Sequence, residues 1–259
     1  MPLVFAGITP HPPLLIPNIG KEKIEDIKKT KEALECMEKE IYVSKPQLII
    51  IISPHSSLYE NAFSVNSSQH FISTYENFGD LSTKKEWKGS SQYAARLSQC
   101  CKDNNIPLQT VSQEKLDHGA SVPLFYLTNH LKNVEILPIG YSRLNAMEHI
   151  RFGEALKEVI MENEKRVAVI ASGDLSHNLP KKSKKESFDK KLIYFLKEKS
   201  IANLIELDST DALKKADECG YRSLLILMGI LKKLDYTFSE ETYEHPFGVG
   251  YLTGSFNLG

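Results

Sequence analysis

The chain has 259 residues, of which 41% are hydrophobic and 25% are charged, and its formal net charge is -1. This balance argues against a protein whose main partner is a nucleic acid, because such proteins usually carry a basic surplus or stripe. No apolar stretch approaches the ~20 residues that cross a bilayer, and the N-terminus lacks the basic and long apolar regions of a signal peptide. The four cysteines form no CxxC pair. We therefore expect a cytoplasmic protein with reduced thiols.

The first half of the chain predicts alternating strands and helices. Buried strands are expected at residues 3–9, an apolar run, and at 47–52, where the sequence is QLIIII. Between them, residues 21–41 carry apolar side chains at helical spacing and predict an amphipathic helix. A further strand is expected at 62–65. Residues 71–88 are polar and irregular, and we expect them to form a long excursion over the surface.

The second half continues this alternation and ends in a strand pair. The helix that begins at 122 has Pro123 in its first turn, where a proline is well tolerated. The basic run at 181–185 is expected to be the solvated start of a helix. Helices are expected at 90–104, 122–130, 146–162, 187–198, 209–216 and 220–233, and strands at 108–111, 134–139, 166–171, 236–242 and 250–256.

This order of elements predicts an α/β fold with a mainly parallel central sheet and helices on both faces. The chain shows no break in composition, no repeat and no glycine- or serine-rich linker. We therefore expect residues 1–259 to form a single domain.

The histidines follow the predicted strands. His11, His55 and His177 each come a few residues after an apolar strand, and His118 follows a weaker one. Ligands of parallel α/β sheets bind beyond the carboxyl ends of the strands, so these imidazoles are expected to meet in one crevice. The remaining histidines (His70, His130, His149 and His245) are expected to be surface residues without a role in the site.

Several imidazoles in one crevice favour metal chemistry. Neutral imidazole is a common ligand for iron, zinc and copper, and a spare histidine can act as a general base because its pKa lies near neutrality. The competing chemistry of a serine hydrolase lacks its G-x-S-x-G motif after a strand. Neither G-x-x-x-x-G-K-[ST] nor G-x-G-x-x-G occurs, so nucleotide binding is not supported.

Four motifs carry a family resemblance. In chain order they are TPHPP at 9–13, SPH at 53–55, LDHGASVPL at 116–124 and SGDLSH at 172–177. The set resembles LigB-like proteins, which are the catalytic subunits of class III extradiol ring-cleaving dioxygenases, and the related Memo-type proteins. The resemblance covers nearly the whole chain.

Two further segments resemble a subgroup of these proteins. They are ECGYRSL at 218–224 and HPFGVGY at 245–251. Members of this subgroup often accompany AMMECR1-type domains, so the resemblance implies an AMMECR1-type partner. The class also often forms dimers, so a homo-oligomer is an alternative to a monomer.

The resemblance implies a metal site with one open question. His11 and His55 match the two histidine ligands of the family's iron. The third ligand of the ring-cleaving enzymes is a carboxylate, for which Glu218 is the best candidate here. Its neighbour Cys219 is the rival, because Memo-type proteins place a cysteine near this position. A His₂Glu site suits Fe(II), whereas a softer His₂Cys site changes the metal preference toward zinc or copper.

The resemblance also implies roles for the other motif residues. His177 matches the catalytic acid and base, and His118 matches a histidine of the substrate pocket. Asp174 and Asp117 are expected to position the substrate or to orient an imidazole. Glu218 also has a structural explanation, because a carboxylate is favoured at the N-terminus of the helix that follows it.

The function expected from this resemblance is an Fe(II)-dependent dioxygenase that opens the ring of a small aromatic diol with O₂. Two alternatives remain. One is a Memo-type metal-binding or redox-linked factor without ring-cleaving activity. The other is a metal-dependent hydrolase that acts through a metal-bound water.

Overall fold

The structure is built on one ten-stranded mixed sheet, of which the order along the main path is β4-β5-β7-β2-β8-β1-β10-β9. The computed structural model describes residues 2–179 and 187–259. Off the main path, β3 pairs with both β6 and β7. The strands are β1 (Leu3–Thr9), β2 (Leu48–Ser53), β3 (Phe63–Asn66), β4 (His70–Tyr75), β5 (Asp80–Gly89), β6 (Leu108–Val111), β7 (Glu135–Gly140), β8 (Val167–Ser172), β9 (Tyr236–Glu244) and β10 (Tyr251–Leu258).

The centre of the sheet is parallel. β1 pairs with β8, β8 with β2, and β2 with β7, all in the same direction. The last residues of β1 and β8, Thr9 and Ser172, are paired in register. β10 and β9 continue the sheet antiparallel beyond β1. The sequence prediction of an α/β fold with a mainly parallel sheet is therefore confirmed, and the loops after β1, β2 and β8 leave the sheet at the same edge.

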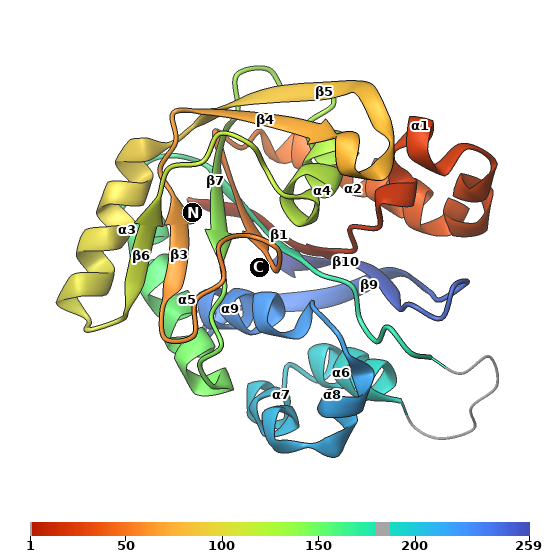
Figure 1. The fold of residues 1–259 in the computed structure, drawn as a ribbon. Coiled ribbons are helices and arrows are strands. Elements are labelled where there is room, and N and C mark those ends of the chain that lie inside the picture. The colour runs from red at the N-terminus through yellow and green to blue at the C-terminus, as the bar shows by residue number, and fades with distance from the viewer. Residues whose placement is uncertain (1, 180–186) are drawn as a thin grey trace.

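Helices cover both faces of this sheet (Figure 1). β2 shows why, because Ile50 and Ile52 point into one apolar core and Ile49 and Ile51 point into the other. The first core is closed mainly by α3, α5, α6 and α9, and the second by α2 and α4. The helices are α1 (Pro17–Gly20), α2 (Lys28–Ser44), α3 (Ser91–Asp103), α4 (His118–Leu127), α5 (Ala146–Met161), α6 (Phe188–Lys197), α7 (Ile201–Glu206), α8 (Asp211–Ala216) and α9 (Tyr221–Leu231), with 3₁₀ turns η1 (Pro13–Leu15), η2 (Lys21–Ile27), η3 (Glu76–Phe78) and η4 (Leu207–Ser209).

The prediction that residues 71–88 form an irregular excursion over the surface is wrong. These residues form the hairpin of β4 and β5, which ends one side of the sheet. Only Phe71, Ser73 and Tyr75 of β4 alternate into the interior, and β5 exposes most of its polar side chains. Gly79 turns the hairpin at a φ of 84°, a conformation that glycine adopts without strain.

Two predicted helices begin elsewhere. α4 begins at His118, four residues earlier than expected, because the Asp117 side chain accepts a hydrogen bond from Ala120 N and caps the helix. Pro123 consequently lies inside α4 and not in its first turn. The helix expected at 21–41 begins as the 3₁₀ turn η2 and becomes α-helical only at Lys28. α7 was not expected.

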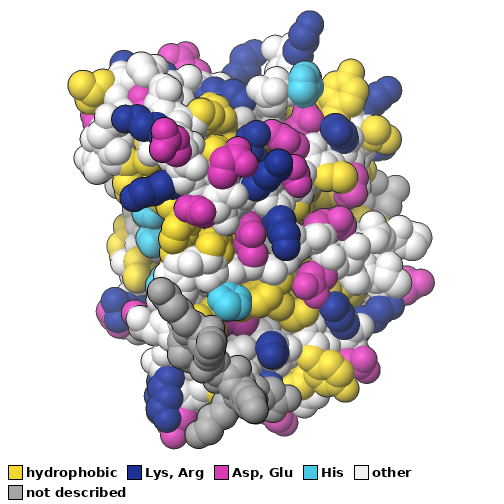
Figure 2. Space-filling model, turned by 90° about the vertical axis from the view of Figure 1, so that its right-hand side faces the viewer, with side chains coloured by type: hydrophobic (Ala, Val, Ile, Leu, Met, Phe, Trp, Pro, Cys, Tyr) yellow, Lys and Arg dark blue, Asp and Glu magenta, His cyan; other side chains and the backbone are white. Residues whose placement is uncertain are grey.

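The surface carries mixed charge. Figure 2 shows basic and acidic side chains interspersed over one face of the molecule. None of the helices in the described residues is long and apolar enough to cross a membrane. All four cysteines are free thiols. The basic run at 181–185, expected to begin a helix, lies outside the described residues.

Removal of apolar volume from the sheet interior should destabilise the fold. Ile50 is fully buried at the centre of β2, so Ile50→Ala is expected to lower the free energy of unfolding by about 2–5 kcal/mol. Val43 is 75% exposed, so Val43→Ala is expected to change it by less than about 0.5 kcal/mol. Urea denaturation followed by circular dichroism measures both values. Equal effects of the two substitutions would contradict the assigned burial.

Candidate metal centre

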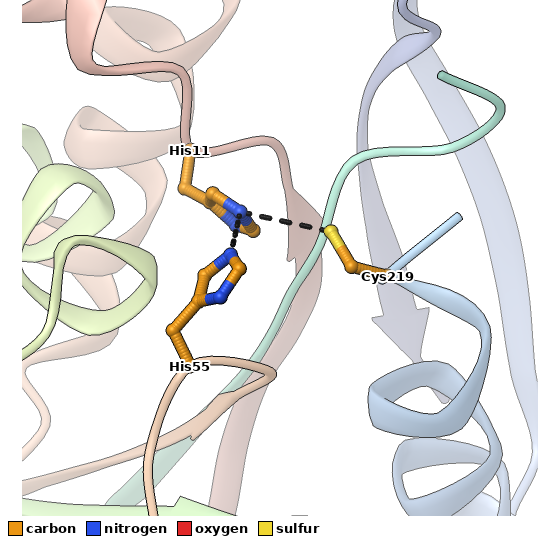
Figure 3. A group of neighbouring side chains, drawn as sticks. All are labelled: His11, His55 and Cys219. Carbon is orange, nitrogen blue, oxygen red and sulfur yellow. Dashed lines mark hydrogen bonds between the residues drawn. The ribbon is translucent and has the colours of Figure 1, made fainter. Parts of the chain in front are cut away.

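Three side chains from distant parts of the chain converge beyond the carboxyl edge of the sheet. His11 follows β1, His55 follows β2, and Cys219 lies two residues before the start of α9. His11 Nε2 lies 3.1 Å from His55 Nε2 and 3.7 Å from Cys219 Sγ. One potential ligand atom of each residue lies within 4.8 Å of those of the other two. Figure 3 shows the two imidazoles and the thiol pointing toward one another from opposite sides.

A chain of hydrogen bonds fixes which nitrogen of His11 carries its proton. Pro123 has no N–H, so within α4 it leaves the carbonyl of Gly119, four residues earlier, without its helical donor. That carbonyl instead accepts a hydrogen bond from Ser172 Oγ at 2.5 Å. Because the Ser172 hydroxyl has only one proton, it must accept from His11 Nδ1, which lies 3.0 Å away. His11 therefore presents an unprotonated Nε2 to the cluster.

Asp174 ties His11 to Cys219. Its carboxylate accepts a hydrogen bond from His11 N at 2.9 Å, and its own N–H donates to Cys219 Sγ at 3.3 Å. Cys219 N and Gly220 N both donate back to the Asp174 carbonyl. The two segments approach so closely that a Cβ on Gly173 would lie 2.0 Å from Gly220 Cα. Glycine at Gly173 is therefore required to bring the thiol into the site.

Asp117 and His118 support His55 from the other side. Ser53 Oγ donates to the Asp117 carboxylate at 2.5 Å and accepts a hydrogen bond from His55 N at 3.3 Å. The imidazole of His118 stacks on that of His55, with ring centroids 4.1 Å apart. A Cβ on Gly119 would lie 3.1 Å from His55 Cδ2, so this glycine also leaves room for the His55 imidazole. The loop after β2 is thus held by the first turn of α4.

The electrostatics keep the imidazoles neutral. Burial, followed by the nearby His55, His118 and His177, lowers the pKa of His11 well below its usual value. Burial also lowers the pKa of His55, and it lowers the pKa of His118 to about 4. Neutral imidazoles are the form that binds metal. Burial raises the pKa of the Cys219 thiol, with the Asp174 carboxylate adding to this effect, so the thiol would lose its proton only to a metal.

The three donor atoms fit a transition metal. Bonds of about 2.0–2.1 Å to nitrogen and about 2.3 Å to sulfur place neighbouring ligand atoms about 3–4 Å apart. The observed separations of 3.1 Å and 3.7 Å lie in this range. The hydrogen bonds from His11 Nδ1 to Ser172 Oγ and from Asp174 N to Cys219 Sγ are the outer contacts that such ligands need.

The side chains of the two candidates for the third ligand point in different directions. Cys219 Sγ belongs to the cluster, whereas the Glu218 carboxylate accepts a hydrogen bond from Tyr221 N at 2.5 Å and caps the start of α9. Burial raises the pKa of Glu218 to about 7. His177 is half-buried, and its Nε2 lies 3.8 Å from Cys219 Sγ. The geometry therefore brings Cys219 and His177 to His11, and it directs Glu218 to the helix backbone.

A pocket of about 660 Å³ opens beside the cluster. His55, Asp117 and His118 line it, and Phe78 from the β4–β5 hairpin packs its ring against His118. Asp174 does not line this pocket: it is buried behind His11, and burial raises its pKa to about 7. Its observed contacts orient the donor residues.

The other histidines lie outside the site. His149 is fully buried in the first core and packs against Phe63, so the expectation of a surface position is wrong for it. Its two ring nitrogens lie near the carbonyls of Asn145 and Ser142. His70 and His130 are exposed and pair with Glu86 and Glu38. His245 lies in the turn between β9 and β10.

Sequence reasoning missed Ser172, Gly119 and Phe78 as parts of the site. A signal for the first two was present, because a proline inside a helix always frees the carbonyl four residues before it. Seeing that signal requires α4 to begin at His118, which depends on the Asp117 cap. Phe78 lies in the hairpin that the sequence did not predict, and nothing in its neighbours marks it.

Comparison with known proteins identifies the family. Residues 6–254 match the family described as the catalytic LigB subunit of aromatic ring-opening dioxygenase. The chain belongs to the LigB family, and thus to a family of dioxygenases. Its membership of the AMMECR1-associated subgroup stays a prediction.

Individual relatives are similar at low identity. A Clostridium acetobutylicum protein named Protein CA_C1420 is 28% identical over 94% of this chain and 55% of its own length. The 4,5-DOPA dioxygenase extradiol of Beta vulgaris is 26% identical over 60% of this chain and 58% of its own length. The chain thus spans little more than half of these relatives. The crystal structure of an uncharacterized Escherichia coli K12 protein, JW3007, shares the fold with a TM-score of 0.65 at 16% identity, covering 97% of this chain and 99% of that one.

Loss of the Ser172 hydroxyl should weaken metal binding without unfolding the protein. Ser172→Ala frees the Nδ1 proton of His11 from its acceptor, and such outer contacts are worth about 10- to 100-fold in metal affinity. Competition with a chromophoric chelator measures zinc affinity. Ser121→Ala is the matched control, because Ser121 is also buried in this region but its hydroxyl has no partner among the described residues. Unchanged affinity in Ser172→Ala would contradict the assigned tautomer.

Proposed function

We propose that this protein is a metal-dependent extradiol-type dioxygenase that opens the ring of a small aromatic diol with O₂. The observation that carries the proposal is the cluster of His11, His55 and Cys219 beside a pocket, in a chain of the LigB family. His11, His55 and Cys219 are the proposed ligands, and Fe(II) is the proposed metal, with zinc or copper as the alternatives that a thiolate ligand favours. Residues 1–259 are proposed to act as one catalytic domain.

Each side chain has a proposed task. When bound, the metal would supply a Lewis acid with open positions for the diol and for O₂. His118 and Phe78 would hold the aromatic ring beside His55, and Asp117 would keep His55 in place through Ser53. Asp174 would orient His11 and the thiol from behind.

His177 is the proposed acid and base. Its half-buried imidazole faces the cluster at 3.8 Å from Cys219 Sγ, which is close enough to reach a ligand bound there. It would take a proton from a diol hydroxyl and later return one to the oxygenated product. Because His177 is not among the three clustered donors, its loss should affect proton transfer and leave metal binding intact.

Metal content distinguishes the two candidates for the third ligand. His55→Ala and Cys219→Ser each remove a donor atom, and both proteins are expected to bind much less than one equivalent of metal after dialysis. Glu218→Gln is the matched variant and is expected to keep full stoichiometry, because that carboxylate caps α9. Elemental analysis of protein purified without oxygen measures this. Full metal content in Cys219→Ser with loss in Glu218→Gln would reverse the assignment.

Turnover distinguishes the acid–base residue from the ligands. His177→Ala is expected to lower kcat for the wild-type protein's best catechol by about 10²–10⁴-fold while metal content stays at the wild-type level. An oxygen electrode and elemental analysis give the two values. If His177→Ala loses the metal, or if it turns over at the wild-type rate, this role is refuted.

A second candidate function has one specific observation in its favour. A Memo-type metal-binding or redox-linked factor without ring-cleaving activity would have a softer site, and Cys219, not Glu218, lies with the two histidines. Anaerobic loading with Fe(II), followed by oxygen and a panel of catechols, separates the two functions. Ring-opened product with any catechol supports the dioxygenase, and full metal loading without product or oxygen uptake supports the binding factor.

A further inference from the structure

One wall of the pocket beside the cluster comes from the β4–β5 hairpin, which lies outside the four sequence motifs. The hairpin of β4 and β5 is tied to the segment before α4, because Ile72 N donates to Glu114 O at 2.8 Å and Leu116 N donates to Ile72 O at 2.9 Å. Phe78, at the end of η3 before the hairpin turn, therefore faces His118, with ring centroids 5.2 Å apart and planes at 67°. An aromatic ring entering beside His55 would meet Phe78 in an edge or offset contact.

The pocket is larger than one aromatic ring. Its volume of about 660 Å³ lies in the range of sites that hold drug-sized ligands, so a bare catechol would fill only part of it. Asn77 and Gln113 are also among its lining residues, and their side chains carry amides. These groups suit a substituent that donates and accepts hydrogen bonds.

The charges around the pocket do not suit an anion. Among the described residues that line the pocket, Lys115 is the one lysine or arginine, and its Nζ already lies 3.6 Å from the Glu76 carboxylate. Glu114 and Asp117 line the same pocket. A carboxylate on the substrate would therefore find no unpaired positive charge among the lining side chains and would face the exposed carboxylate of Glu114, a repulsion that salt would screen.

We propose that this site takes a catechol whose ring rests against Phe78 and whose substituent is uncharged and hydrogen-bonding, and that it discriminates against carboxylate-bearing catechols. The proposal rests on the proposed function, because it assumes that a catechol binds beside the cluster. It makes Phe78 a specificity-determining residue, and it makes Glu114 the source of the charge discrimination.

The test compares an amide and a carboxylate that differ in one group, with catechol as the unsubstituted reference. Anaerobic calorimetry of the Fe(II)-loaded full chain measures the affinity of 3-(3,4-dihydroxyphenyl)propionamide, of the corresponding propionate and of catechol itself. At low salt the amide is expected to bind about fivefold or more tightly than the propionate. Glu114→Gln and 1 M salt are each expected to reduce this ratio to below about twofold.

The aromatic contact is tested with three variants. Phe78→Ala is expected to weaken all three ligands about threefold to tenfold. Phe78→Leu keeps apolar bulk without the ring and should show a smaller part of that loss. Leu81→Ala is the control, since Leu81 is 76% exposed on the same hairpin and does not line the pocket. It is expected to leave every affinity unchanged.

The possible results distinguish a failure of the proposed substrate preference from a failure of the proposed function. If no catechol binds the loaded wild-type protein, the proposed function fails and this inference fails with it. If catechol binds but the propionate equals or exceeds the amide, only the charge discrimination is overturned. If Phe78→Ala binds all three ligands like the wild type, the role of Phe78 is overturned.

Discussion

The hydroxyl of Ser172 is the contact on which the geometry of the site depends. It joins three segments that are far apart in sequence, because it donates to Gly119 O at the start of α4 and accepts from His11 Nδ1 after β1. Its single proton decides the tautomer of His11. That decision depends in turn on Pro123, which cannot supply the helical N–H that would otherwise occupy the Gly119 carbonyl. The missing N–H of Pro123 thus sets the tautomer in which His11 could bind a metal.

The parallel sheet makes this contact feasible. Thr9 and Ser172 end neighbouring strands in register, so the loops that carry His11 and Asp174 leave the sheet side by side. The lack of a side chain at Gly173 then lets the start of α9 come close enough to bring in Cys219. Two buried carboxylates fix these loops by hydrogen bonds. Asp174 accepts from the backbone N–H of His11, and Asp117 accepts from Ser53, which in turn supports the loop of His55. Burial raises the pKa of both.

The sequence predicted those parts of the molecule that have strong local signals. Continuous apolar runs predicted β1, β2 and β8. Because ligands of parallel sheets bind beyond the carboxyl ends of the strands, the sequence also predicted that His11 and His55 lie close together. The same reasoning failed at 71–88, because only three residues of β4 alternate into the interior and β5 is mostly polar. As a result, the wall of the pocket that carries Phe78 was not foreseen.

The choice between Glu218 and Cys219 was beyond sequence reasoning for a different reason. The two residues are adjacent, and both precede a helix, so position along the chain cannot separate them. What separates them is direction: the Glu218 carboxylate turns back to Tyr221 N, and the Cys219 thiol points to His11. The cap of a helix and the close approach of two glycines decide this, and both are contacts between backbone segments.

The central claim is a metal centre of two imidazoles and one thiolate. X-ray absorption spectroscopy of the zinc-loaded protein tests it directly, because sulfur and nitrogen ligands differ in distance and scattering. We expect one sulfur at about 2.3 Å together with two imidazole nitrogens at about 2.0–2.1 Å, and loss of the sulfur shell in Cys219→Ser. A wild-type spectrum that contains nitrogen and oxygen ligands alone would contradict the claim.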